Sequence, residues 1–244
     1  MCIRDSYPIQ KSDDYIRGRC YESAQKIYTP AVHPREPFAT SRGMRVSPFY
    51  EREVTLRGYF MEVAGWERAH GYAANEETLL AKYRDQVPVR EAEWDSRHFW
   101  EVSNAEQLAM SEGVGMINLS HFAIFDVEGA DAEGLMEYLS VAKVGADTAI
   151  GKGVYTHFLD HAGGIRSDLT IIRLAEDCFR VVCGGDTGHR DYIWMRDMSD
   201  RKGFSNVTFH DRSEELATLG LWGPEARVTL AKLIDDPELS LIHI

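Results

Sequence analysis

Residues 151–188 decide the fold, and they run GKGVYTHFLDHAGGIRSDLTIIRLAEDCFRVVCGGDTG. Three segments rich in aromatic and β-branched residues alternate there with short turns that carry glycine or acidic residues. This pattern is typical of strands joined by tight connections. We therefore predict three strands, the first two of them paired as a hairpin across the turn at Gly163 and Gly164.

Asp168 stands where this glycine turn leads into the second strand. Two glycines let the backbone turn tightly and let another molecule approach closely, because no Cβ stands in the way. An acid placed just after such a turn can meet a bound amine, so Asp168 is our candidate for the catalytic residue. The alternative is a local role, since Asp is a common turn and capping residue that hydrogen-bonds its own backbone.

Charge and composition exclude several classes of protein. The net charge is −12 and no basic stripe is present, which opposes a nucleic-acid role. No apolar run approaches the roughly eighteen residues that span a bilayer. The cysteines lack CxxC spacing, and Cys178 and Cys183 would lie on opposite faces of one strand, too far apart to bond. We expect free thiols, no metal site, and a cytoplasmic location, or the mitochondrial matrix in a eukaryote.

The first hundred residues predict a less compact region. Residues 7–29 have the approximate spacing of an amphipathic helix, and four prolines between 29 and 48 favour an extended connector. The aromatic-rich stretch up to Tyr72 looks loop-like, and we expect it to pack against a neighbouring domain. Residues 73–98 are polar and charge-mixed, so we predict a surface excursion with little to anchor a core.

Two later segments indicate a repeated unit. After a helix over about 104–113 and one or two strands within 114–129, the segment 125–139 (FDVEGADAEGLMEYL) aligns without gaps with 219–233 (LGLWGPEARVTLAKL). Both predict a strand, a glycine and a helix, with Asp131 capping the first helix and Pro224 at the first position of the second. Two copies of one unit favour a pseudo-symmetric body, and chance similarity is the alternative.

Five motifs, in order, then point to a family. They are SRGMRVSPFYERE, GWERAHGY, GMINLSHFAIFDVEGADA, GKGVYTHFLDHAGGIRSDLTIIRL and ATLGLWGPEAR. Together they resemble the middle and C-terminal part of dimethylglycine and sarcosine dehydrogenases. These are flavoprotein amine oxidases whose C-terminal half is similar to glycine-cleavage T-protein, the aminomethyltransferase.

The resemblance implies an α+β fold with strand-helix-strand units and antiparallel sheets. It places an extended middle region of the flavin-dependent oxidoreductase at residues 1–72 and a folate-binding domain at 73–244. FAD belongs to an N-terminal domain outside this chain, since no G-x-G-x-x-G motif is present and CGGDTG at 183–188 has the wrong spacing. The ends MCIRDS and LSLIHI look foreign, so we expect a fragment that stops before the folate site is complete.

The resemblance also assigns site residues and partners. The family's key aspartate falls on Asp168, its companion tyrosine on Tyr155, and the cofactor is expected to pass close to Gly163 and Gly164. Tetrahydrofolate, a small N-methylated amine and the absent FAD domain are the implied partners, and the implied reaction forms 5,10-methylenetetrahydrofolate. The hairpin register we predict sets Asp168 opposite Asp160, so a proton relay from Tyr155 is not expected. Tyr155 then either contacts ligand or packs in the core.

Three departures and three rival readings remain. Asn118, Ile124 and His70 replace an Asp, a Lys and a Pro that are frequent in the family. A metal site on His157 and His161 is disfavoured, because the neighbouring glycines forbid the helix that HExxH geometry needs. A serine hydrolase lacks its G-x-S-x-G elbow. A non-catalytic folate-binding or interaction module, dependent on the missing flavin domain, stays open as an alternative.

Overall fold

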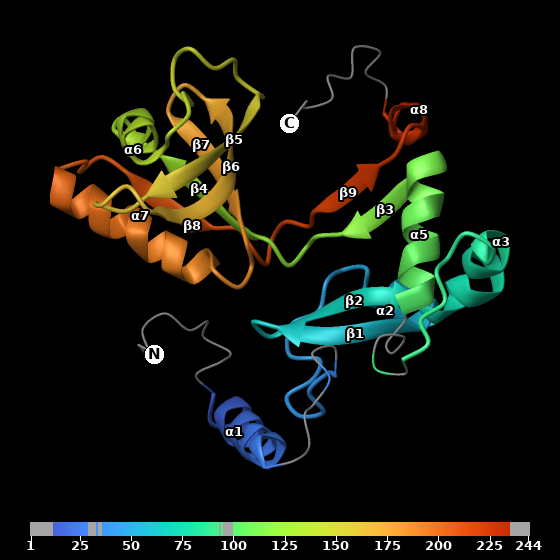
Figure 1. The fold of residues 1–244 in the computed structure, drawn as a ribbon. Helices are drawn as coiled ribbons and strands as arrows, with labels where there is room; N and C mark the ends of the chain where they lie inside the picture. Colours follow the sequence, from blue (N-terminus) through green and yellow to red (C-terminus); the bar gives the residue numbers. More distant parts are fainter. Residues whose placement is uncertain (1–11, 29–32, 34–35, 93, 95–99, 235–244) are drawn as a thin grey trace. The chain divides into compact units, whose positions relative to one another are not determined.

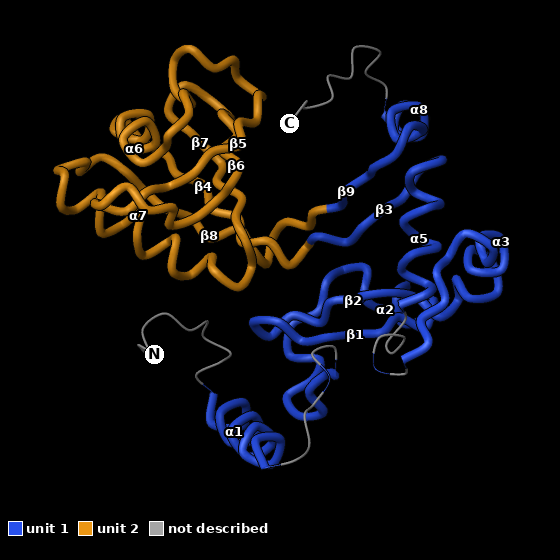
Figure 2. The backbone as a smooth tube through the Cα atoms, viewed as in Figure 1, with its two compact units in different colours: residues 1, 6–119, 219–239 blue, residues 2–5, 120–218, 240–244 orange. Residues whose placement is uncertain are grey.

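The computed structural model describes residues 12–28, 33, 36–92, 94 and 100–234. Within them the chain forms two compact units: residues up to 119 together with those from 219 onward make the first, and residues 120–218 make the second (Figure 2). The second unit is therefore inserted into the first. Among the described residues, no helix is both long enough and apolar enough to cross a membrane.

The second unit is built on a five-stranded antiparallel sheet in the order β5-β6-β7-β4-β8 (Figure 1). Its strands are β4 (Ala123–Glu128), β5 (Gly153–Leu159), β6 (Ile165–Ala175), β7 (Cys178–Cys183) and β8 (Thr208–Asp211). The three strands predicted within 151–188 are thus confirmed as β5, β6 and β7. Cys178 and Cys183 lie on opposite faces of β7, as predicted, because burial alternates along that strand.

One face of this sheet packs against the helices α6 (Ala132–Leu139) and α7 (Gly188–Lys202). Strand residues such as Phe125, Ile171 and Val181 form one buried cluster with Leu135 of α6 and Met195 of α7. Side chains alternate along a strand, so the residues between these core positions point to the opposite face. Asp168 is exposed between two buried neighbours of β6, and it therefore lies on the face that the helices do not cover.

The repeated strand-glycine-helix unit is confirmed in both copies. β4 leads through Gly129 into α6, and β9 (Leu219–Trp222) leads through Gly223 into α8 (Ala226–Leu230). The φ angles of the two glycines are 129° and 112°, in the region that disfavours a side chain. A Cβ would also come within 2.2 Å of a carbonyl oxygen at each, that of Asn206 at the first and that of Gly113 at the second.

Two details of these helix starts were predicted wrongly. Asp131 occupies the N-cap position of α6, as predicted, but its side chain caps no helical N–H, because its carboxylate accepts a hydrogen bond from the backbone N–H of Asn206 at 2.9 Å. Pro224 precedes the second helix instead of opening it, since α8 begins at Ala226.

The first unit contains two small antiparallel sheets. β1 (Gly58–Val63) pairs with β2 (Trp66–Tyr72), and β3 (Gly115–Asn118) pairs with β9. The aromatic stretch before residue 73 is thus a short helix, α2 (Tyr50–Thr55), and a hairpin, which corrects the loop-like prediction. The helix predicted within 7–29 is present as α1 (Asp13–Ile27), with Ser12 as its N-cap.

The prediction of a surface excursion at 73–98 is wrong for the described part of that segment. It forms η3 (Ala73–Asn75), a π-helix η4 (Glu76–Leu80) and α3 (Ala81–Tyr83). Leu80 and Tyr83 are buried in a cluster with Val102 and Ala105 of the helix α5 (Trp100–Glu112). A few apolar residues at helical spacing anchor this region, although most of its residues are polar.

Candidate functional site

The hairpin of β5 and β6 brings Tyr155 and Asp168 together on the open face of the sheet. His157 pairs with Asp168 and Tyr155 pairs with Thr170, so Tyr155 and Asp168 are diagonal neighbours. The Tyr155 hydroxyl donates a hydrogen bond to Oδ2 of Asp168 at 3.3 Å. The side chain of Tyr155 is 49% exposed. Its pKa is raised, first by partial desolvation of the phenol and then by the charge and the hydrogen bond of Asp168.

This geometry corrects the predicted register. Asp168 was expected opposite Asp160, yet it pairs with His157. The difference arises because Asp160 opens the turn instead of ending the strand. Its Oδ1 accepts the backbone N–H groups of Ala162 and Gly164, both at 2.8 Å, and a bulge follows Phe158. The second strand therefore begins at Ile165 and not at Asp168, which sets Asp168 opposite His157 and within reach of Tyr155.

The turn itself explains both of its glycines. Gly163 has φ of 83°, with nothing within 4 Å of a Cβ placed there, so its conformation is what favours glycine. At Gly164 a Cβ would lie 2.9 Å from Oδ2 of Asp160. Their contact with a cofactor stays a prediction. The carboxylate that hydrogen-bonds its own turn here is Asp160, whereas Asp168 makes no such local contact.

The strand that carries Asp168 is fastened from the core side by the first turn of α7. Asp191 is fully buried, and its Oδ2 accepts the hydroxyl of Ser167 at 2.7 Å and that of Thr187 at 3.1 Å. The neighbouring Arg190 donates to the carbonyl of Arg166 at 2.9 Å. The backbone is thus held at the two residues just before Asp168. Asp191 was not predicted as a site residue, because its only signal in the sequence is an acid at a helix start.

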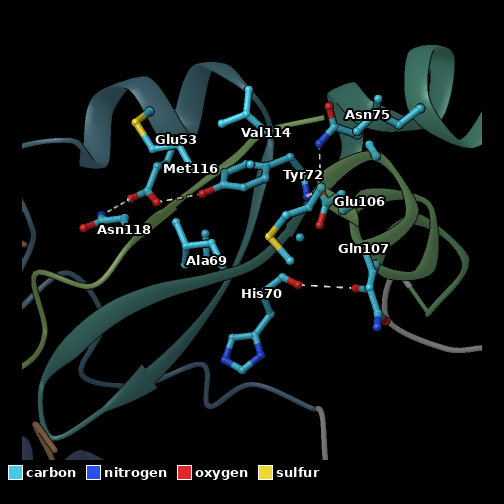
Figure 3. A pocket seen from close by; sticks show the side chains of 17 residues that line it. Glu53, Ala69, His70, Tyr72, Asn75, Glu106, Gln107, Val114, Met116 and Asn118 are labelled. Carbon is cyan, nitrogen blue, oxygen red and sulfur yellow. Dashed lines mark hydrogen bonds between the residues drawn. The ribbon is translucent and has the colours of Figure 1, made fainter. Parts of the chain in front are cut away.

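A cavity lies wholly within the first unit. It is a cavity of about 520 Å³ lined by residues of β2, α5 and β3 together with Glu53 of α2 (Figure 3). Tyr72 joins its two carboxylates: the phenol donates to Glu53 at 2.8 Å, and the backbone N–H donates to Glu106 at 3.3 Å. Burial raises the pKa of Tyr72, and the bond to Glu53 raises it further. Asn118 also donates to Glu53, at 3.0 Å.

Asn118 and His70 line this cavity, and in the sequence they stand out only as departures from the family pattern. Glu53 and Glu106 are far apart in the sequence: Glu53 ends the motif SRGMRVSPFYERE, and Glu106 lies outside all five motifs. For metal ions, the described part of the chain contains no group of three or more His, Cys, Asp or Glu side chains placed to hold one.

Comparisons with known proteins extend this picture. Residues 49–243 match the GCVT N-terminal domain, and residues 6–47 match the FAD dependent oxidoreductase central domain. The chain is 31% identical over 225 residues to 4-methylaminobutanoate oxidase (formaldehyde-forming) of Paenarthrobacter nicotinovorans, covering 92% of this chain and 25% of that protein. It is 28% identical over 249 residues to mitochondrial sarcosine dehydrogenase of Mus musculus, covering 91% and 27%. The chain thus spans about a quarter of the length of these relatives.

A solved structure shares the fold. The aminomethyltransferase T of the glycine cleavage system from Bartonella henselae superposes with a TM-score of 0.60 at 22% identity, covering 82% of this chain and 47% of that one. The predicted α+β architecture with antiparallel sheets is confirmed by this match and by the sheets described above.

Proposed function

Because this chain belongs to the GCVT N-terminal domain family, we propose that its second unit binds tetrahydrofolate and promotes transfer of a one-carbon unit onto it. The one-carbon unit would come from a small N-methylated amine, such as dimethylglycine or sarcosine. An FAD domain outside this chain would oxidise that amine. The match of residues 6–47 to a flavin oxidoreductase central domain, and the flavin-type relatives, support this setting.

The observation that carries the proposal is the Tyr155–Asp168 pair on the uncovered sheet face. Tetrahydrofolate, when bound, supplies a secondary amine as the acceptor of the one-carbon unit. The residues present fit such a group: Asp168 is exposed, lies beside a glycine turn and has one oxygen, Oδ1, without a partner among the described residues. Tyr155 would fix the carboxylate through Oδ2 and leave Oδ1 to accept a proton from the attacking amine. The negative charge also favours the positive charge that develops as the new bond forms.

The test measures binding and reaction separately. Equilibrium binding of tetrahydrofolate and the rate of formaldehyde capture above the uncatalysed background are determined for the parent chain and for Asp168→Ala. We expect the capture rate to fall by at least about 100-fold, the lower range for loss of a general base, while binding weakens by less than about tenfold. Glu176→Gln removes an exposed carboxylate from the turn after β6 and serves as the charge control, with no expected effect.

Two outcomes would contradict parts of the proposal. Equal capture by the parent and Asp168→Ala would remove the catalytic role of Asp168. Tight binding of tetrahydrofolate with no rate enhancement by the parent would favour the alternative, a non-catalytic folate-binding or interaction module that depends on the flavin domain. Flavin absorbance in the purified chain would contradict the placement of FAD outside it.

A further inference from the structure

The cavity of the first unit, here called the Glu53–Glu106 cavity, contains the two carboxyl side chains after which it is named. Among the residues that the structure describes, neither carboxylate forms an ion pair with Lys, Arg or His. Their hydrogen-bond donors are neutral: a phenol, two side-chain amides and one backbone N–H. Buried carboxylates are ordinarily compensated by an opposite charge.

Glu106 has an oxygen left over. Its Oε1 accepts both available bonds, from Nδ2 of Asn75 at 2.7 Å and from the N–H of Tyr72 at 3.3 Å. Its Oε2 accepts none from a described residue, although the side chain lines the cavity (Figure 3). Burial raises the pKa of Glu106 in spite of these two bonds, so the ionised form is disfavoured while the cavity holds no cation.

Glu53 fixes the other side of the cavity. It is only 6% exposed, and both of its oxygens are occupied, Oε1 by the hydroxyl of Tyr72 and Oε2 by the amide of Asn118. Figure 3 shows Glu53 and Glu106 at opposite ends of the Tyr72 side chain. Glu53 is therefore rigidly placed, whereas Glu106 offers a free acceptor.

The rest of the wall is largely apolar. Leu79, Met110, Val114 and Met116 all line the cavity. A volume of about 520 Å³ lies within the usual range for small-molecule pockets, about 300–1,000 Å³. An inorganic cation would keep its hydration shell and gain nothing from these side chains, whereas an alkyl group would bury its surface against them.

We propose that the Glu53–Glu106 cavity binds a small protonated organic amine, with its ammonium group at Oε2 of Glu106 and its alkyl part against Met110 and Met116. This site lies in the first unit, whereas the proposed folate site lies in the second, so either can fail without the other.

The experiment compares a cation with a neutral molecule of the same length. The full chain is titrated with n-butylammonium chloride and, separately, with 1-butanol, and binding is followed by the backbone amide NMR signals of Tyr72, Asn75 and Asn118. We expect saturable shifts with butylammonium and at least about tenfold weaker binding of butanol, as loss of a charge-assisted bond predicts.

Matched variants locate the charge. Glu106→Gln can keep both bonds to Oε1 while it removes the charge, and it should weaken butylammonium binding at least about tenfold. Glu101→Gln removes a carboxylate of the same helix that pairs with Arg84 at 2.7 Å and does not line the cavity, so affinity should stay unchanged. Ala69→Leu fills the cavity without changing its charge, and it should also weaken butylammonium binding. This variant keeps the proposal testable if Glu106→Gln does not fold.

Several results would overturn the proposal. They are absence of saturable binding to the parent chain, equal binding of butanol, and equal binding by Glu106→Gln and the parent. Displacement of butylammonium by millimolar Mg²⁺ would also overturn it, since this would mark a site for an inorganic cation.

Discussion

The hydroxyl of Tyr155 donates a hydrogen bond to Oδ2 of Asp168 at 3.3 Å, across two neighbouring strands. Each residue lies on the sheet face opposite the buried core, and the ring of His157 stands edge-on to that of Tyr155 at 5.3 Å. The phenol therefore orients a carboxylate that the helices leave uncovered. Its raised pKa keeps it protonated, and so a donor, throughout the physiological range.

The first prediction concerns this bond. Tyr155→Phe removes the donor and should slow formaldehyde capture about fivefold, which corresponds to about 1 kcal/mol for one partly exposed hydrogen bond, while tetrahydrofolate affinity changes less. Thr170→Val removes a hydroxyl from the residue paired with Tyr155 and is the control, with no expected change. Equal rates for Tyr155→Phe and the parent would remove Tyr155 from the mechanism.

The second prediction concerns the support of β6. Asp191→Asn weakens the acceptor of the Ser167 and Thr187 hydroxyls inside the core, so unfolding free energy should fall by about 1–3 kcal/mol. Urea unfolding of Asp191→Asn, Ser167→Ala and the double variant measures the coupling. We expect the double variant to cost clearly less than the sum of the two single variants. If the losses of unfolding free energy in the two single variants simply add, the 2.7 Å contact between Ser167 and Asp191 does not stabilise the fold.

The third prediction concerns the glycine corner before α6. Gly129→Ala puts a Cβ within 2.2 Å of the carbonyl oxygen of Asn206 at a φ of 129°, and it should destabilise the fold by more than about 2 kcal/mol. Gly203 also has a positive φ, 79°, but has nothing within 4 Å of a Cβ, so Gly203→Ala should cost only about 1 kcal/mol. Thermal unfolding of the two variants separates the effect of the steric clash, present only at Gly129, from the effect of the positive φ angle, present at both. Similar losses of stability in the two variants would contradict a contribution from the clash.

The fourth prediction concerns pH. Because burial raises the folded-state pKa of Glu106 above its unfolded value of 4.5, its charge opposes folding above that raised pKa. The penalty disappears as pH falls through the folded pKa toward the unfolded one. Glu106→Gln should therefore raise the melting temperature at pH 7 and lose this advantage near pH 4. A variant that is less stable than the parent at pH 7 would show that the charge is compensated.

The sequence predicted the sheet better than the connections between its strands. Residues 151–188 show alternating apolar positions, and the three strands followed directly from them. The register did not, because the carboxylate of Asp160 holds a tight turn, so that β6 begins at Ile165 and Asp168 lies opposite His157. The diagonal contact of Tyr155 with Asp168 depends on that one detail.

The two candidate sites differ in how much of each could be predicted from the sequence. Asp168 could be singled out from the sequence because the pattern around it, a glycine turn followed by a strand, is local. The role of Asp191 depends on where α7 packs, and the Glu53–Glu106 cavity joins segments from α2, β2 and α5. Contacts between distant segments leave no periodic signal in one sequence. The division of the chain at residue 72 and the cofactor contacts of Gly163 and Gly164 stay predictions.

The insertion of one unit into the other has a practical consequence. The chain leaves the first unit after Asn118 of β3 and returns at Leu219 of β9, and these two residues are register partners in one ladder. Ser120 and Thr218 join the two crossing segments just beyond them, through a hydrogen bond of 3.3 Å from the N–H of Thr218. A short β-turn could therefore replace the whole insert, and the remaining polypeptide would retain every residue of the Glu53–Glu106 cavity. Conversely, the second unit could be inserted into a loop of another protein, since its two ends lie side by side.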